Sequence, residues 1–158
     1  MPQDPRSTQP NTQPNTLKTL IENITEELFN QKDLSAIDRY FSAEYIWNDA
    51  PPGFHGREGM RNYCMAFFRA FPDYTLTNFQ LLCEGDRVVQ YFLGRGSHLD
   101  TWMHIPATKR SMECKGITIY RVENTQIVEE WMVTDSLKMM QDLDLVRFVD
   151  PSSIKSPS

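Results

Sequence analysis

Two side chains in this sequence, Asp135 and His98, are of types that can move a proton at neutral pH. Asp135 follows an apolar run typical of a β-strand, and period-2 alternation places it on one face with Ile127, Glu129, Trp131 and Val133. If that face lines a cavity, loss of hydration raises the pKa of the carboxyl toward neutrality, as acid–base catalysis requires. Asp135 also precedes a predicted helix over 136–143, so the alternative role is an N-cap.

His98 follows a segment that contains Gly94 and Gly96, where a strand can bulge. An imidazole there can relay a proton or donate a hydrogen bond to a ligand carbonyl. The alternative is a strand residue packed against its cross-strand neighbour.

Further candidates for ligand contact lie in turns and loops. Trp47 and Asn48 end a short apolar strand, where an indole can form a pocket wall and an amide can hold a substrate oxygen; a core aromatic and a turn residue are the alternatives. His55 precedes a predicted helix, and His104 lies in a loop. The spacing of His98 and His104 matches no common zinc motif, so no metal site is predicted.

Composition limits the class of protein. With 158 residues, of which 40% are hydrophobic, the chain can form one domain with a substantial core. The net charge of −5 argues against a nucleic-acid partner, and no apolar run is long enough to span a membrane. The three cysteines (Cys64, Cys83 and Cys114) are odd in number and far apart, which favours a reducing, cytoplasmic location.

Hydrophobic periodicity predicts helices first and strands afterwards. The polar, proline-rich residues 1–16 are expected to be a disordered tail, 17–149 the domain, and 150–158 a flexible tail. The expected helices are 17–30, a short one capped by Asp33, one from about Arg57 that Pro72 ends, and 136–143. The expected strands are Tyr45–Trp47, Thr75–Cys83, Arg87–Leu93, Ser111–Val122 and Gln126–Val133.

This order predicts an α+β fold in which three N-terminal helices pack on one face of a mostly antiparallel sheet. A strongly curved sheet wrapped around helices leaves a cone, whose open end is a natural site for a ligand.

Several short motifs occur in series along the predicted domain. They are Ala70-Phe71-Pro72-Asp73-Tyr74, Glu84-Gly85-Asp86-Arg87-Val88-Val89, Gly96-Ser97-His98, Ile105-Pro106-Ala107-Thr108-Lys109-Arg110, Gly116-Ile117 before Tyr120-Arg121, and Ile127-Val128-Glu129-Glu130-Trp131-Met132-Val133-Thr134-Asp135. In this order and spacing the chain resembles the SnoaL-like polyketide cyclases of the nuclear-transport-factor-2-like (NTF2-like) superfamily. The resemblance implies an NTF2-like cone, a homodimer or homotetramer, and chemistry without a cofactor.

The resemblance also implies a reaction. Family cyclases close a ring by an intramolecular aldol step, with an Asp as acid/base and a His nearby. The positions that match this His and Asp are Thr118 and Met132, neither of which titrates near neutral pH. The family's aspartate four residues after Trp131 is retained as Asp135.

Two functions follow as hypotheses. The first is a cofactor-free cyclase, isomerase or hydrolase that acts on a small hydrophobic, oxygenated molecule, with Asp135 as the acid/base and His98 or Asn48 polarising a carbonyl. The second is a binding module with the same cavity and no turnover, which Thr118 and Met132 favour. The expected substrate contacts are Trp47, Asn48, His55, His104, Thr118 and Met132.

Overall fold

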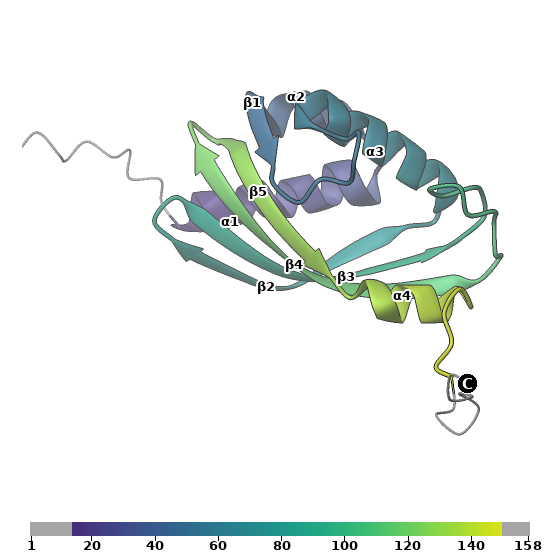
Figure 1. The fold of residues 1–158 in the computed structure, drawn as a ribbon. Coiled ribbons are helices and arrows are strands. Elements are labelled where there is room, and N and C mark those ends of the chain that lie inside the picture. Colours follow the sequence, from purple (N-terminus) through teal and green to yellow (C-terminus); the bar gives the residue numbers. More distant parts are fainter. Residues whose placement is uncertain (1–13, 150–158) are drawn as a thin grey trace, which may run out of the picture.

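The computed structural model describes residues 14–149, so the predicted tails fall outside the described residues except for 14–16 (Figure 1). Residues 14–16 form the first turn of helix α1 (Pro14–Ile24). Pro14 fits this place because the first turn of a helix has no partner for a backbone N–H. The apolar residues of α1 are buried, as their spacing predicts: Leu17, Leu20, Ile21 and Ile24.

The predicted helix 17–30 changes its geometry at residue 25. Thr25–Asn30 forms the π-helix η1, whose side chains reach the edge strand β2 (Thr75–Glu84). The Thr25 hydroxyl and the Asn78 amide exchange hydrogen bonds of 3.1–3.2 Å, and Asn30 bonds both backbone groups of Leu76. Short π-helical segments occur often at functional sites. These contacts fix η1 against the sheet.

Two short-range predictions have different outcomes. Helix α2 (Ala36–Tyr40) has Ser35 rather than Asp33 at its N-cap, so the predicted cap was wrong. The Asp33 carboxylate instead accepts hydrogen bonds from the Ser35 N–H (2.9 Å) and hydroxyl (2.6 Å), an Asx-type turn before the helix. Helix α3 (Gly56–Ala70) buries Met60, Cys64 and Phe68 on one stripe, as predicted.

The sheet confirms the α+β prediction, with the three N-terminal helices on its inner face (Figure 1). The strand order is β1-β5-β4-β3-β2; β1 runs parallel to β5 and all other neighbours are antiparallel. Helix α4 (Ser136–Asp142) follows the last strand. The remaining strands are β1 (Phe41–Trp47), β3 (Arg87–Ser97), β4 (Ser111–Glu123) and β5 (Gln126–Thr134).

β3 runs beyond Leu93, where the prediction ended it. Gly94 and Gly96 remain in the ladder and pair with β4. A Cβ atom at Gly94 would lie 2.3 Å from the Tyr74 hydroxyl oxygen. Glycine at this position therefore makes room for the Tyr74 ring and does not interrupt the strand.

A β-bulge in β5 changes which side chains face the core. Val122 pairs with Ile127 and Arg121 pairs with Glu129, so Val128 is an extra residue without a partner. Ile127 and Glu130, three residues apart, are therefore both buried. The predicted common face from Ile127 to Asp135 was wrong, and Val133 is 73% exposed.

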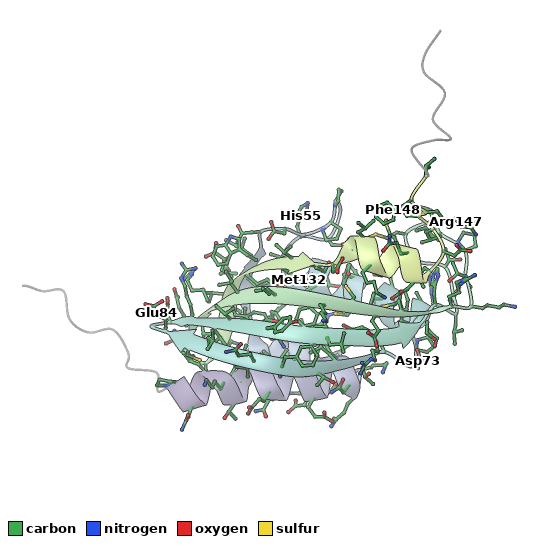
Figure 2. All side chains as sticks on the ribbon, turned by 90° about the horizontal axis from the view of Figure 1, so that it is seen from below. His55, Asp73, Glu84, Met132, Arg147 and Phe148 are labelled. Atoms are coloured by element: carbon green, nitrogen blue, oxygen red, sulfur yellow. The ribbon has the colours of Figure 1, made fainter. Side chains whose placement is uncertain are left out.

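The outer face of the sheet is seen in Figure 2, where side chains stand free across the strands. Exposed apolar side chains on the strands include Phe79, Ile117 and Val133. The homodimer or homotetramer stays a prediction. None of the helices within 14–149 is long and apolar enough to cross a membrane.

We expect Gly116→Ala to destabilise the fold. A Cβ atom at Gly116 would lie 2.4 Å from the edge of the Phe92 ring, inside the buried face of the sheet. Overpacking of this kind costs about 1–3 kcal/mol, measurable by urea unfolding. Lys115→Ala, on the exposed side of the same strand, is the control and should change stability little. Equal stability of the Gly116 variant and the wild type would contradict the packing argument.

Candidate functional site

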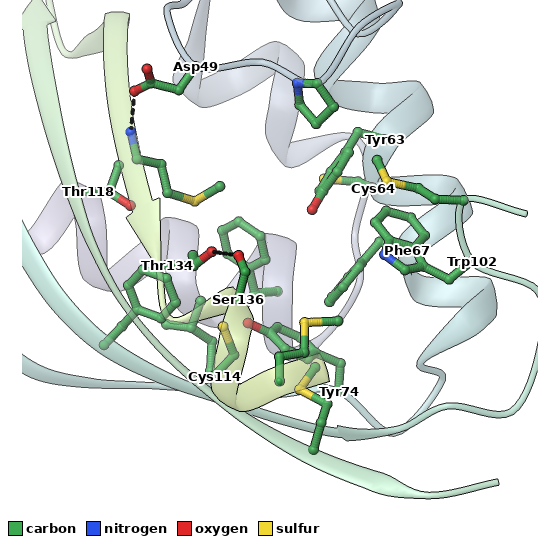
Figure 3. A pocket seen from close by; sticks show the side chains of 18 of the residues that line it. Asp49, Tyr63, Cys64, Phe67, Tyr74, Trp102, Cys114, Thr118, Thr134 and Ser136 are labelled. Atoms are coloured by element: carbon green, nitrogen blue, oxygen red, sulfur yellow. Dashed lines mark hydrogen bonds between the residues drawn. The ribbon is translucent and has the colours of Figure 1, made fainter. Parts of the chain in front are cut away.

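A cavity of about 410 Å³ lies between the inner face of the sheet and helix α3. Figure 3 shows Thr118 and Thr134 of the sheet on one side and Tyr63, Phe67 and Trp102 on the other. Residues of the loop between β3 and β4 and of α4 complete the wall. The volume is that of a typical small-molecule site.

The wall is mainly apolar and unusually rich in two side-chain types. Aromatic rings include Phe41, Trp47, Tyr63, Phe67, Phe92 and Trp102. Six methionines also line the cavity, namely Met60, Met103, Met112, Met132, Met139 and Met140. Flexible thioethers adapt to ligands of different shape and pack well against aromatic rings. The cavity therefore suits a hydrophobic molecule.

Glu130 is the buried acid of this cavity and is only 3% exposed. Burial raises the pKa of its carboxyl to about 8; the negative charge of Asp49 adds to the increase and the Tyr45 hydroxyl opposes it. Among the described residues that line the cavity there is no lysine or arginine to pair with it. A carboxyl in this setting exchanges a proton near neutral pH.

A chain of hydrogen bonds that starts at η1 holds the polar side chains beside Glu130 in place. Tyr120 lies directly opposite Glu130 on β4, and its hydroxyl donates a hydrogen bond to Gln90 Oε1 at 3.0 Å. The Gln90 amide in turn donates to Asn78 Oδ1 at 2.7 Å and to Thr25 Oγ1 at 3.1 Å. This buried chain of hydrogen bonds fixes the orientation of Tyr120 at the cavity wall.

Asp49 is the second acid that lines the cavity. Its carboxylate accepts a hydrogen bond from the Met132 N–H at 3.1 Å, which fastens the turn after β1 to strand β5 (Figure 3). Thr118 lies opposite Met132 on β4.

His98 lines the cavity and is fully buried against the ring of Phe71, at 5.1 Å between ring centroids. Its Nδ1 atom accepts a hydrogen bond from the Thr108 N–H at 3.3 Å, which leaves the proton of the neutral ring on Nε2. Nε2 has no partner within the described structure. Burial lowers the pKa of His98, against the opposing effect of the Asp100 backbone carbonyl, so the ring is neutral at pH 7.

Residues 19–143, which include every element that borders this cavity, match the family model of the SnoaL-like polyketide cyclases. The chain belongs to this family. No curated protein sequence matches it significantly.

Several solved structures share the fold. TsrD from Streptomyces laurentii is 25% identical with a TM-score of 0.77, over 84% of this chain and 97% of that one. IdmH from Streptomyces antibioticus, described as a candidate polyketide cyclase, is 27% identical with a TM-score of 0.71, over 84% of this chain and 99% of its own. AclR from Streptomyces galilaeus, described as a candidate hydroxylase, is 20% identical with a TM-score of 0.76, over 89% of this chain and 92% of that one. At this identity the similarity shows a shared fold and no shared function.

The structure brings four of the predicted site residues of this SnoaL-like protein to the cavity: Trp47, His98, Thr118 and Met132. Their roles toward a ligand stay predictions.

The other three predicted substrate contacts do not line the cavity. The Asn48 side-chain amide bonds Glu129 Oε1 at 3.1 Å and the Glu130 carbonyl oxygen at 3.2 Å, so it secures the turn after β1. His55 and His104 are exposed, His55 at the start of α3 and His104 in the tight turn between Trp102 and Ile105.

Asp135 does not line the cavity either, because the bulge at Val128 turns its face of the strand outward. Its carboxylate accepts a hydrogen bond from the Lys138 N–H at 3.0 Å, the first turn of α4. The N-cap alternative is confirmed.

Glu130 was not among the site residues predicted from the sequence. The sequence did contain a signal for a buried acid. Two consecutive acids, Glu129 and Glu130, in a half-buried strand place one carboxylate on each face of the sheet. Unbroken alternation assigned the inner face to Glu129, which lies instead beside Arg121 at 2.9 Å.

The described residues offer no cluster of three or more His, Cys, Asp or Glu side chains that could hold a metal ion. Cys64 lines the cavity, but burial raises the pKa of its thiol, which leaves it a poor nucleophile.

We predict that Asp135→Ala costs about 1 kcal/mol of stability, since the first turn of α4 loses its acceptor. Asp135→Asn should cost little, because Asn ranks beside Asp as an N-cap. Urea unfolding of the two variants measures the difference. An Asn variant as unstable as the Ala variant would contradict the capping role.

The stability of the protein should fall with rising pH because of Glu130. The pKa of its carboxyl is about 8 in the folded protein and near 4.5 in the unfolded chain. Between these values the folded state keeps a proton that the unfolded state has released, so stability falls with rising pH by at most about 5 kcal/mol and levels off above pH 8. Glu130→Gln removes this dependence, so its stability relative to wild type should increase from pH 5 to 8.5.

Urea unfolding across this pH range tests the prediction, with Glu129→Gln as the matched control. The pKa of Glu129 is lowered by Asn48 and Arg121, so Glu129 is ionised in both states above pH 5 and its variant should run parallel to wild type. A constant difference between Glu130→Gln and wild type would show that Glu130 titrates normally.

Proposed function

We propose that this SnoaL-like protein binds a small hydrophobic, oxygenated molecule in its cavity, and that Glu130 is the acid/base of a cofactor-independent, aldol-type ring closure. The observation that carries the proposal is a buried carboxyl inside an apolar cavity, where the residues of 14–149 that line the cavity include no cationic partner. Glu130 replaces Asp135 in this role.

The protonation state of Glu130 suits the chemistry. With a pKa of about 8, about one tenth of the carboxyl is ionised at pH 7. The carboxylate takes a proton from a carbon next to a carbonyl, and the resulting enolate attacks a second carbonyl of the same molecule. The protonated Glu130 then returns the proton to the new alkoxide, so the step needs no other reactant.

The place of Glu130 on the strand supports this assignment. The positions that match the family's His and Asp, Thr118 and Met132, are cross-strand neighbours. Tyr120 and Glu130 form the next inward-facing pair along the same ladder, about 7 Å away. A polar pair, of which Glu130 titrates near neutral pH, thus lies one step along the wall from the position that the resemblance implies for the family.

His98 supplies a further polar group to the cavity. Its Nε2–H has no partner in the described structure, and a buried donor of this kind gains from a ligand oxygen. Donation to a substrate carbonyl would polarise it without transfer of charge, since the ring is neutral.

The second candidate function is a binding module without turnover. Thr118 and Met132 favour it, because the family's own acid/base positions carry no titratable group. The cavity and its apolar wall serve this function equally well.

The test measures carbon acidity on a simple ketone, so it does not depend on the identity of the natural substrate. Tryptophan fluorescence reports binding of 1-tetralone, a bicyclic ketone, because Trp47 and Trp102 line the cavity. NMR in D₂O then measures deuterium exchange at the carbon next to its carbonyl. We expect exchange faster than in buffer, and a loss of that acceleration by a factor on the order of 10²–10⁴ in Glu130→Gln.

Asp135→Asn is the control for this exchange and should keep the wild-type rate. Binding of 1-tetralone with exchange only at the buffer rate would favour the binding module. Loss of exchange in Asp135→Asn but not in Glu130→Gln would return the acid/base role to Asp135.

A further inference from the structure

The acidic side chains that line the cavity have no cationic side chain beside them in the described lining. Glu130 and Asp49 both line it, whereas its described lining contains no lysine or arginine, and His98 is neutral. Arg61 of helix α3 follows the lining residue Met60 in the sequence but does not line the cavity itself. Its guanidinium group donates hydrogen bonds to Asp38 at 2.8 Å and to the Leu34 carbonyl at 3.1 Å. A bound anion would therefore meet two acids and no cation.

The titratable groups that interact with Glu130 come from β1, the turn after it, β4 and α3. None of them is a cation. They are Tyr45 of β1, Asp49 of the following turn, Tyr120 of β4, and Tyr63 and Cys64 of α3. Within residues 14–149 the carboxyl therefore lacks the counter-charge that buried acids normally have.

Aromatic rings surround the same space. Trp47 is the neighbour of Glu130 on strand β1, and its ring meets that of Tyr63 edge to face at 5.0 Å. Tyr63 stacks on Phe67 with a centroid distance of 5.9 Å. The faces of such rings attract cations, and a carboxylate beside an aromatic wall is the usual way to bind an organic ammonium group.

We infer that the ligand of this cavity carries a positively charged nitrogen on a hydrophobic frame, with Glu130 as its counter-ion beside Trp47. The inference rests on the proposed function, because it concerns the same ligand in the same cavity. It assigns a charge to that ligand, which the proposed function leaves open.

A cationic ligand also changes the state of Glu130. A positive charge close to the carboxyl stabilises its ionised form, so binding releases the proton that Glu130 holds at neutral pH. The ionised form is the one that accepts a proton from carbon. The ligand would thus convert Glu130 into the base that the proposed reaction needs.

The experiment compares three probes of similar size and different charge on the full chain. They are phenyltrimethylammonium, its uncharged carbon isostere tert-butylbenzene, and benzoate. Trp47 and Trp102 report binding by fluorescence between pH 6 and 8.5. None of these probes titrates in that range, so any change in affinity with pH belongs to the protein.

At pH 8.5 we expect the cation to bind at least tenfold more tightly than its isostere, and benzoate to bind most weakly. Below pH 8 the affinity for the cation should fall by up to tenfold per pH unit, because Glu130 must release a proton first, while that of the isostere stays constant. Glu130→Gln should bind the cation and the isostere equally. Glu129→Gln, with its acid on the outer face, should keep the preference.

Equal affinity of the wild type for the cation and the isostere at pH 8.5 would overturn the inference. The same holds if benzoate binds best, or if the preference survives in Glu130→Gln. In each of these cases binding of tert-butylbenzene still supports a hydrophobic binding cavity. Failure of all three probes to bind would overturn the proposed function together with the inference.

Discussion

The β-bulge at Val128 is the constraint on which the rest of the cavity depends. The extra residue shifts the alternation of β5 by one position, so that Glu130 faces inward and Asp135 faces outward. In a strand without the bulge, Glu130 would face outward and Asp135 would face the cavity. Bulges often redirect side chains at functional sites in this way.

Burial of Glu130 has a cost in stability at neutral pH that the surrounding structure must offset. The apolar packing of α1 and α3 against the sheet supplies most of that stability. The hydrogen-bonded chain from Thr25 through Gln90 to Tyr120 gives each of these neighbouring polar groups a partner, so that the cost of desolvation falls mainly on Glu130. The π-helix η1 contributes by bringing Thr25 to this chain.

The proposed acid/base position requires no change in the architecture of the fold. Inward-facing positions recur every second residue along a ladder, and each offers a place on the cavity wall. Glu130, the acid/base that we propose, lies one such position from Met132, where the resemblance implies the acid/base of the family cyclases. A shift of this size moves the reactive group relative to the ligand while helices, strands and cavity remain, which is consistent with one fold that serves several chemistries.

The sequence by itself determined the α+β fold and the order of the elements, because these follow from local periodicity. For Asp135 it offered an N-cap and a catalytic role as alternatives and did not decide between them. It also identified Trp47, His98, Thr118 and Met132, which lie in the cavity. The extra residue in β5 becomes visible only when β5 pairs with β4, since a bulge is defined by its partner strand. Burial and pKa of Glu130 depend on strands and a helix far apart in the chain, so only the tertiary structure could decide which acid the cavity receives.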